Sequence, residues 1–178
     1  MIKKTMIIED IFESYPQRAE KLAHILMQFG LQCVGCHVAT TETLEAGIIG
    51  HGIQDQLDEI LKALNDEISR PLDTISLMPL AAQKFKDFCK SENKDGFGLR
   101  FGEVESSCCQ RQYVLDFEEK ATLNDRTFHS NGISIFVKQN LVKQLLGSEI
   151  DYIEELNNTG FKVFNPNSKS SCKCKGHE

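Results

Sequence analysis

The sequence contains no tryptophan, only three tyrosines and only four prolines among its 178 residues. It also lacks a long apolar run. The longest uncharged stretch, residues 22–41, is interrupted by histidines, glutamines and glycine, which argues against a membrane-spanning helix. Near the N-terminus, Lys3 and Lys4 are followed too closely by Glu9 and Asp10 to form a secretory signal. We therefore expect a cytoplasmic protein that does not enter a membrane.

Basic residues are scarce as well. The chain has 20 lysines and arginines against 26 aspartates and glutamates, a net charge of -6. A protein that binds nucleic acid generally needs a basic face. This charge balance therefore predicts that nucleic acid is not a partner.

Cysteine, by contrast, is abundant. Seven cysteines fall into four groups along the chain, namely Cys33 with Cys36, Cys89 alone, Cys108 with Cys109, and Cys172 with Cys174. In a reducing cytosol, clustered cysteines more often bind metal or carry out redox chemistry than form structural disulfides. The grouping therefore indicates thiol or metal chemistry.

The first 70 residues have a helical period. Apolar residues at helical spacing predict one helix ending before Gly30, and Leu57, Ile60, Leu61, Leu64 and Ile68 form the apolar stripe of another. Pro71 then marks a linker. We expect a small all-α domain over residues 1–69.

After the linker, one more helix is expected near residues 79–91, with Leu80, Ala81, Phe85 and Phe88 facing inward. The segments that follow alternate as strands do, and Asn131-Gly132 predicts a tight hairpin turn. Two further strands are expected in "EIDYI" and "GFKVF", followed by a flexible polar tail. The predicted fold class is α+β, with a mainly β domain over residues 70–178.

The tail carries the pair Cys172-Lys173-Cys174 between lysines and serines. Alternate side chains of an extended segment point the same way, so both sulfurs can face one ligand. The neighbouring lysines favour the thiolate, which is the form that binds metal. The alternative is an incidental pair of exposed thiols. Cys89 lies on the inward stripe of its helix and is expected to pack as a small apolar residue.

The pair Cys33 and Cys36, in "CVGC", follows the end of a predicted helix. The spacing suits a redox pair or half of a metal site. A thioredoxin-like interpretation needs a βαβ context, which this segment lacks. The pair is retained as a candidate second metal site or as a thiol–disulfide pair.

From about Ile75 to Cys174 the sequence closely resembles the A-type iron–sulfur cluster assembly proteins, the HesB/IscA-like family. The resemblance is carried by "PLAAQKFKDFCKSE", "GLRFG", "QYVLDFEE", "NGISIFV", "EIDYIEEL" and "GFKVFNPNSKSSCKC". Cys108, Cys172 and Cys174 fall on the three cysteine positions of that family.

This resemblance implies a compact β-rich domain that binds iron or a [2Fe–2S] cluster through those three cysteines. It also implies transfer of the cluster to apo iron–sulfur proteins, contact with the cluster-assembly machinery, and a homo-oligomer, often a dimer. Clusters are commonly held by four thiolates, so one chain supplies three of them. The resemblance does not predict an enzyme.

The turn around Cys108 departs from the family pattern. It reads "ESSCCQ", with Glu105 and Gln110 where glycines usually stand. Glycine allows a close approach of the backbone, and the carboxylates of Glu103 and Glu105 disfavour nearby thiolates. We therefore expect cluster binding to be weaker than in the family, altered, or lost.

The first half resembles a small helical domain of unknown function, through Tyr15-Pro16, "GLQCVGC" and "ETLE". That domain is found near redox and iron–sulfur proteins, which implies no more than an association with this chemistry. Two other functions stay open: a thiol–disulfide protein acting through Cys33 and Cys36, and a non-catalytic interaction module with structural zinc.

Overall fold

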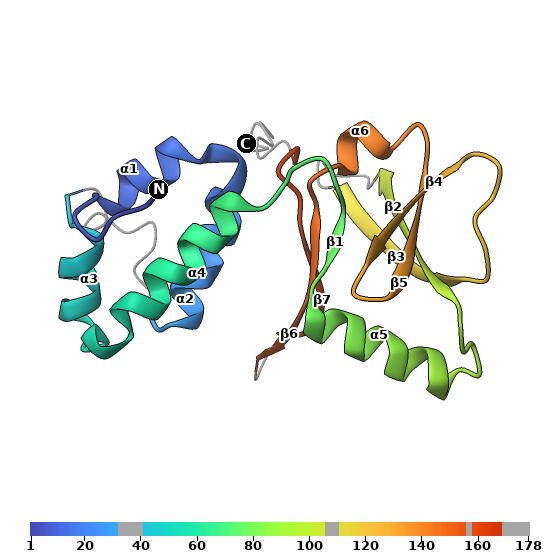
Figure 1. Cartoon of the computed structure of the whole chain (residues 1–178), viewed down its shortest axis with the longest axis horizontal. Helices are drawn as coiled ribbons and strands as arrows, with labels where there is room; N and C mark the ends of the chain where they lie inside the picture. The colour runs from blue at the N-terminus through green and yellow to red at the C-terminus, as the bar shows by residue number, and fades with distance from the viewer. Residues whose placement is uncertain (32–40, 106–110, 156–157, 169–178) are drawn as a thin grey trace, which may run out of the picture. The chain divides into compact units, whose positions relative to one another are not determined.

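The computed structural model describes residues 1–31, 41–105, 111–155 and 158–168. The chain divides into two compact units, Met1–Pro71 and Leu72–Glu178, and each has its own hydrophobic core. Helices make up the first unit, and the second is built mainly of strands (Figure 1). The predicted α+β fold class is thereby confirmed. None of the described helices is both long and apolar enough to span a bilayer.

The first unit consists of four α-helices and two short 3₁₀ turns within its described residues. In chain order these are α1 Ile8–Ser14, η1 Pro16–Arg18, α2 Ala19–Gln28, α3 Leu44–Gly50, η2 Gln54–Gln56 and α4 Leu57–Ser69. Gly30 follows α2 with a φ of +99°, which glycine adopts without strain. Thr43 caps α3, because its side-chain oxygen accepts a hydrogen bond from the Ala46 N–H at 3.2 Å.

An ion pair is buried beside this helical core. The Arg18 guanidinium contacts the Glu67 carboxylate at 2.7 Å and also donates to the Arg70 carbonyl oxygen at 2.6 Å. These contacts tie the start of α2 to the end of α4. The apolar stripe predicted on α4 faces the same core, where Ile60 and Leu64 are fully buried.

The second unit contains two sheets, two helices and the connections between them. Its elements are β1 Ser76–Leu77, α5 Pro79–Ser91, β2 Gly98–Glu105, β3 Arg111–Glu118, β4 Asp125–Ser130, β5 Ile133–Lys138, α6 Val142–Leu145, β6 Glu149–Glu155 and β7 Asn158–Phe164. One sheet has the order β1-β6-β7 and the other β3-β2-β5-β4. Strands β3 and β7 are therefore each at the edge of a sheet.

Most strands pair with their sequence neighbours in antiparallel hairpins, whereas β1 with β6 and β2 with β5 pair in parallel. The β4–β5 hairpin turns at Asn131 and Gly132, which both have positive φ. This confirms the tight turn predicted from the Asn-Gly pair. Strand β1, only two residues long, was not predicted, because so short a segment leaves no periodic signal.

Helix α5 has the bounds that were predicted, but its inward face was partly wrong. Ala81 and Phe85 are buried as expected, whereas Leu80 and Phe88 are 42% and 41% exposed. Leu80 and Phe88 are separated by eight residues and so share one stripe of the helix. That stripe lies beside the buried one, so the apolar arc of the helix is wider than the arc that the sheets cover.

Candidate metal centre

The predicted cluster ligands Cys108, Cys172 and Cys174 lie outside the residues that the structure describes, as do Cys33 and Cys36. Their roles therefore stay predictions. The structure describes the strands on both sides of Cys108 and the chain that precedes Cys172 and Cys174, and the candidate centre is argued from these segments.

Cys108 lies in sequence between β2 and β3, which form a regular antiparallel hairpin. Eight residue pairs are in register, from Gly98 with Glu118 to Glu105 with Arg111. Directly opposed residues of an antiparallel pair have Cα atoms about 4.5–5.5 Å apart. The two strand ends that flank Cys108 are thus held close together by the ladder itself.

The chain that leads to Cys172 and Cys174 is fastened after β7. The Asn165 amide donates to the Gln144 carbonyl oxygen at 2.9 Å, and the Asn167 amide donates to the Leu146 carbonyl oxygen at 2.7 Å. Asn165 is buried. The asparagines therefore fix the chain against helix α6 before it continues towards the two cysteines.

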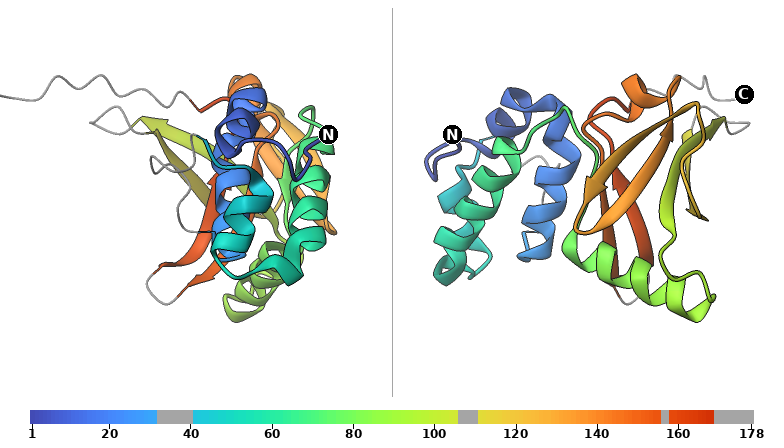
Figure 2. Two further views of the ribbon diagram at one scale, coloured as in Figure 1. Left: turned by 90° about the vertical axis from the view of Figure 1, so that its left-hand side faces the viewer. Right: turned by 45° about the vertical axis from the view of Figure 1, so that its right-hand side comes forward.

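The paired ends of β2 and β3 and the hydrogen-bonded chain after β7 lie at the same end of the second unit. Strand β2 ends, β3 begins and β7 ends beside α6 at the upper end of the unit in Figure 1, and both views of Figure 2 agree. Strands β2 and β7 both run towards that end. The described chain ends that flank Cys108 and precede the C-terminal cysteine pair therefore lie at one end of the second unit.

The hairpin near this end has two different faces. On the inner face, Phe101 packs against Tyr113 with ring centroids 5.9 Å apart, and Glu103 is the register partner of Tyr113. On the outer face, Val104 is opposite Gln112 and Val114 is opposite Gly102, so the two valines are diagonal neighbours, and both are exposed. The β2–β3 hairpin next to the candidate centre is therefore packed against the core on its inner face and carries exposed apolar side chains on its outer face.

Cys89 is the one cysteine among the described residues, and it is buried in the core of the second unit. This burial confirms the packing role predicted for it and raises the pKa of the Cys89 thiol, which disfavours the thiolate. A metal ligand needs the thiolate. No group of three or more His, Cys, Asp or Glu residues that could hold a metal is present among the described ranges.

The hydrogen bonds that hold Asn165 and Asn167 to helix α6 were not predicted from the sequence. Asn165 and Asn167 were noted only as part of a polar stretch, although an Asn-Pro-Asn segment directly after a strand is a recognisable turn signal. Ser168 completes the turn, since its N–H donates to the Asn165 carbonyl oxygen at 3.0 Å.

Comparison with known proteins supplies the family. Residues 74–176 match the family described as iron-sulphur cluster biosynthesis, and residues 2–57 match a domain of unknown function, DUF1858. Proteins named iron-binding protein IscA from Salmonella arizonae and Salmonella enteritidis are each 37% identical over 101 residues, covering 57% of this chain and 94% of the relative.

A solved structure of IscA with the [2Fe-2S] cluster is 27% identical, with a TM-score of 0.51 over 57% of this chain and 93% of that one. The sequence resemblance of both halves is thereby confirmed, although the assignment of a role to the "CVGC" segment is not. The iron–sulphur match covers more than half of the residues. The chain belongs to the iron–sulphur cluster biosynthesis family.

Proposed function

We propose that this protein is a carrier that binds iron or a [2Fe–2S] cluster through the thiolates of Cys108, Cys172 and Cys174. The proposal rests chiefly on one observation. The β2–β3 hairpin end and the chain leaving β7, which flank these cysteines in sequence, lie at one end of the second unit (Figure 1). The relatives named for iron binding, and the solved IscA structure with its cluster, support the choice of cargo.

The covalent chain limits how far each donor can lie from these fixed points. Cys108 is three residues from both Glu105 and Arg111, so its Cα lies within about 11 Å of each paired strand end. Cys172 is four residues beyond Ser168, a reach of about 14 Å. These chain lengths allow Cys108 and Cys172 to reach the same end of the unit, which supports the proposed site.

The donor set suits this cargo. Cysteine thiolates are the usual ligands of iron–sulfur clusters, commonly four to a cluster. One chain offers three, so a second subunit or another thiol completes the set, and we propose a homodimer. Lys173 and its neighbouring lysines favour the thiolates and offset the negative charge of a bound cluster. A cytoplasmic setting keeps the thiols reduced.

The cluster is cargo in this proposal, and the protein holds and releases it without catalysing a reaction. Two of the three donors follow the last strand of the fold. These donors can exchange onto an incoming thiol while the hairpin beside Cys108 stays folded. The expected recipients are apo iron–sulfur proteins, and the expected donors are the cluster-assembly machinery.

Anaerobic reconstitution with iron and sulfide tests the proposal. We expect the full chain to develop visible sulfur-to-iron absorbance with matching amounts of bound iron and sulfide. The triple variant Cys108→Ser, Cys172→Ser, Cys174→Ser should stay colourless. The matched control, Cys33→Ser with Cys36→Ser, removes the remaining grouped thiols apart from Cys109 and should keep the colour. Colour that survives in the triple variant would contradict the site.

Two further measurements separate carrier function from the alternatives. The loaded protein should pass its cluster to an apo-ferredoxin in the presence of a chelator that captures free iron. Elemental analysis of the purified chain distinguishes iron from zinc. Stoichiometric zinc with no cluster formed would instead identify the protein as a structural zinc module.

A further inference from the structure

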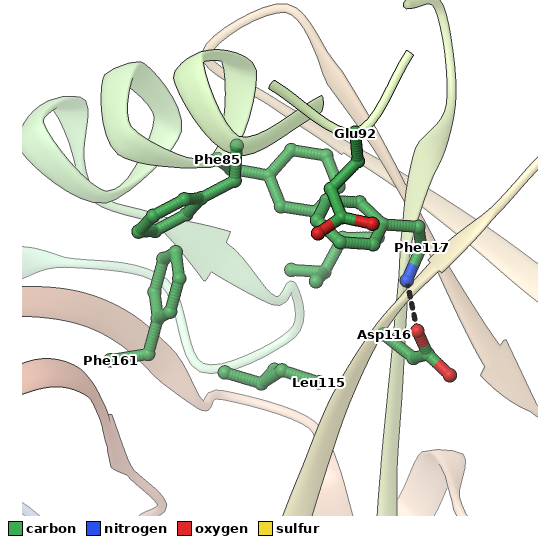
Figure 3. A pocket seen from close by; sticks show the side chains of 8 residues that line it. Phe85, Glu92, Leu115, Asp116, Phe117 and Phe161 are labelled. Atoms are coloured by element: carbon green, nitrogen blue, oxygen red, sulfur yellow. Dashed lines mark hydrogen bonds between the residues drawn. The ribbon is translucent and has the colours of Figure 1, made fainter. Parts of the chain in front are cut away.

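A pocket of about 270 Å³ lies under helix α5 of the second unit, between the edge strands β3 and β7 (Figure 3). Its apolar lining consists of four phenylalanines and two leucines, namely Phe85, Phe88, Leu99, Leu115, Phe117 and Phe161. Its volume is just below the range of about 300–1,000 Å³ that is typical of sites for drug-sized ligands. The pocket therefore suits a smaller ligand with an apolar body.

The aromatic rings of the pocket are held by contacts with one another. Phe85 and Phe117 have centroids 5.3 Å apart, and Phe88 and Phe161 have centroids 6.1 Å apart. Tyr152 of β6 packs edge-on against Phe161, with centroids 5.1 Å apart. Because α5, β3 and β7 already hold these rings, a ligand pays little entropy for ordering the walls of the pocket.

The two charged residues that line the pocket are both acidic and exposed. Glu92 directly follows the end of α5, and Asp116 belongs to β3. The Asp116 carboxylate accepts a hydrogen bond from the Phe117 N–H at 2.7 Å, which keeps it at the rim beside that residue (Figure 3). Within the described part of the chain, Asp116 makes no ion pair. An apolar pocket with such a rim favours a ligand that carries a positive charge.

The protein places one ammonium group of its own beside this rim. The Lys94 Nζ lies 4.4 Å from the centroid of the Phe117 ring and 3.4 Å from a carboxylate oxygen of Glu92. A cation over the face of an aromatic ring is attracted by the negative potential of that face. A ring and a carboxylate that border the pocket thus already hold an ammonium group, although Lys94 itself is not a lining residue.

We propose that this pocket binds a small organic cation, in which a primary ammonium group is attached to an aromatic or branched apolar body. The body lies between the phenylalanine rings, where it is removed from water. The ammonium group lies at the rim near Glu92 and Asp116, and these carboxylates discriminate against neutral and anionic compounds of the same shape. None of the lining residues is a cysteine, so the proposal does not depend on cluster binding.

An NMR titration of the full chain tests the proposal with three probes of similar shape, the cation 2-phenylethylammonium, the neutral 2-phenylethanol and the anion phenylacetate. The metal-free triple serine variant at Cys108, Cys172 and Cys174 serves as the background, so that failure of cluster binding cannot affect the result. The methyl signals of Leu99 and Leu115 should shift. We expect a dissociation constant on the order of 1 mM for the cation. Binding should be about threefold or more weaker for the alcohol, and weakest for the anion.

Charge variants separate the rim from the apolar body of the pocket. Glu92→Gln together with Asp116→Asn should weaken binding of the cation by about threefold to fivefold and leave binding of the alcohol unchanged, because charge is lost while shape is kept. Lys94→Gln should strengthen binding of the cation about twofold, because it removes a competing ammonium from Glu92 and Phe117. The matched control Asp87→Asn changes an exposed carboxylate of α5 that does not line the pocket, and it should alter none of the three affinities.

A filled pocket provides an independent arm. Leu115→Phe adds volume to the lining and should abolish binding of both the cation and the alcohol. Because a larger side chain can also destabilise a packed region, circular dichroism checks that this variant is folded. The charge variants change exposed or half-buried side chains, so they test the proposal even if Leu115→Phe does not fold.

Three results would overturn the proposal. The first is the absence of shifts at Leu99 and Leu115 with the cation up to tenfold above the expected dissociation constant. The second is equal affinity for the cation and the alcohol, or cation binding that the double acid variant leaves intact, since shape alone would then select the ligand. The third is binding that weakens as the protein concentration rises, which would identify a second copy of the chain as the occupant.

Discussion

At the scale of single residues, the Asp125 carboxylate is a buried charge held by several hydrogen bonds. Its side chain is 1% exposed, and Arg100 contacts both of its oxygens. Hydrogen bonds from Arg100 and Thr122 hold the pKa of the Asp125 carboxyl well below its usual range. The same contacts fix the turn between β3 and β4.

Replacing this carboxylate gives a prediction about pH. Asp125→Asn should lower the free energy of unfolding by about 3 kcal/mol at neutral pH, because it leaves Arg100 without its main partner. Folding lowers the pKa of the Asp125 carboxyl. The charged carboxylate therefore makes its full contribution to the free energy of unfolding above the unfolded pKa of about 3.9, and this contribution is lost as the pH falls below that value. Urea unfolding of both proteins should show the difference narrowing below about pH 4.

The exposed neighbour Glu119 provides the control. Glu119→Gln should change the free energy of unfolding by less than about 0.5 kcal/mol at any pH in this range. If the free energies of unfolding of the parent and of Asp125→Asn differed by the same amount down to pH 2.5, the stabilisation would come from packing and not from the charge of Asp125.

At the scale of elements, the bounds of helices and the turn between β4 and β5 were predictable because they rest on local signals. Pro79 suits the first turn of α5, and Asn131 and Gly132 tolerate positive φ. The exposure of Leu80 and Phe88 was not predictable, since it depends on where β7 and β3 pass the helix. The pocket that α5, β2, β3 and β7 line was not predicted for the same reason, because Phe161 of β7 is far in the sequence from the other three elements.

Two glycines of strand β2, Gly98 and Gly102, test how closely β2 packs against β5. A Cβ atom at Gly98 would lie 2.5 Å from the Phe136 ring and 2.6 Å from the Ser134 carbonyl oxygen, so it would collide with strand β5. At Gly102, four residues along the same strand, a Cβ would meet nothing within 4 Å. We expect Gly98→Ala to lower the free energy of unfolding by about 2 kcal/mol or more.

The matched variant Gly102→Ala should stay within about 0.5 kcal/mol of the parent. Both changes add one methyl group to the same strand, so helix and strand propensity cannot account for a difference between them. If Gly98→Ala and Gly102→Ala had the same denaturant midpoint, β2 and β5 would not be as close together as the structure shows.

At the scale of the whole molecule, the sequence distinguished two regions by their periods, and each compact unit has a separate core. The candidate centre was recognised from three cysteine positions through family resemblance. Periodicity alone would not have selected them, because ligands that converge from a hairpin turn and a chain end share no local pattern. The structure adds the strand ends and the asparagine contacts that flank these cysteines, while the ligand assignment itself stays a prediction.

Because the cores are separate, damage to one unit should leave the other folded. Glu67 is buried against Arg18 in the first unit, at 2.7 Å. Glu67→Ala leaves that guanidinium buried without its carboxylate, a loss of about 3–5 kcal/mol. Hydrogen–deuterium exchange should then show faster exchange throughout α2 and α4, whereas the amides of β2 and β5 keep their protection.

The exposed pair Lys62 and Asp66 on the same helix provides the comparison, at 2.6 Å but largely in solvent. Asp66→Ala should change exchange in α4 very little, because exposed ion pairs contribute at most about 1 kcal/mol. If Glu67→Ala instead removed protection from β5 to the same extent as from α4, the two units would unfold as one cooperative body. In that case the first unit would be a structural requirement of the iron–sulphur unit, and every loading experiment on the second unit would have to retain it.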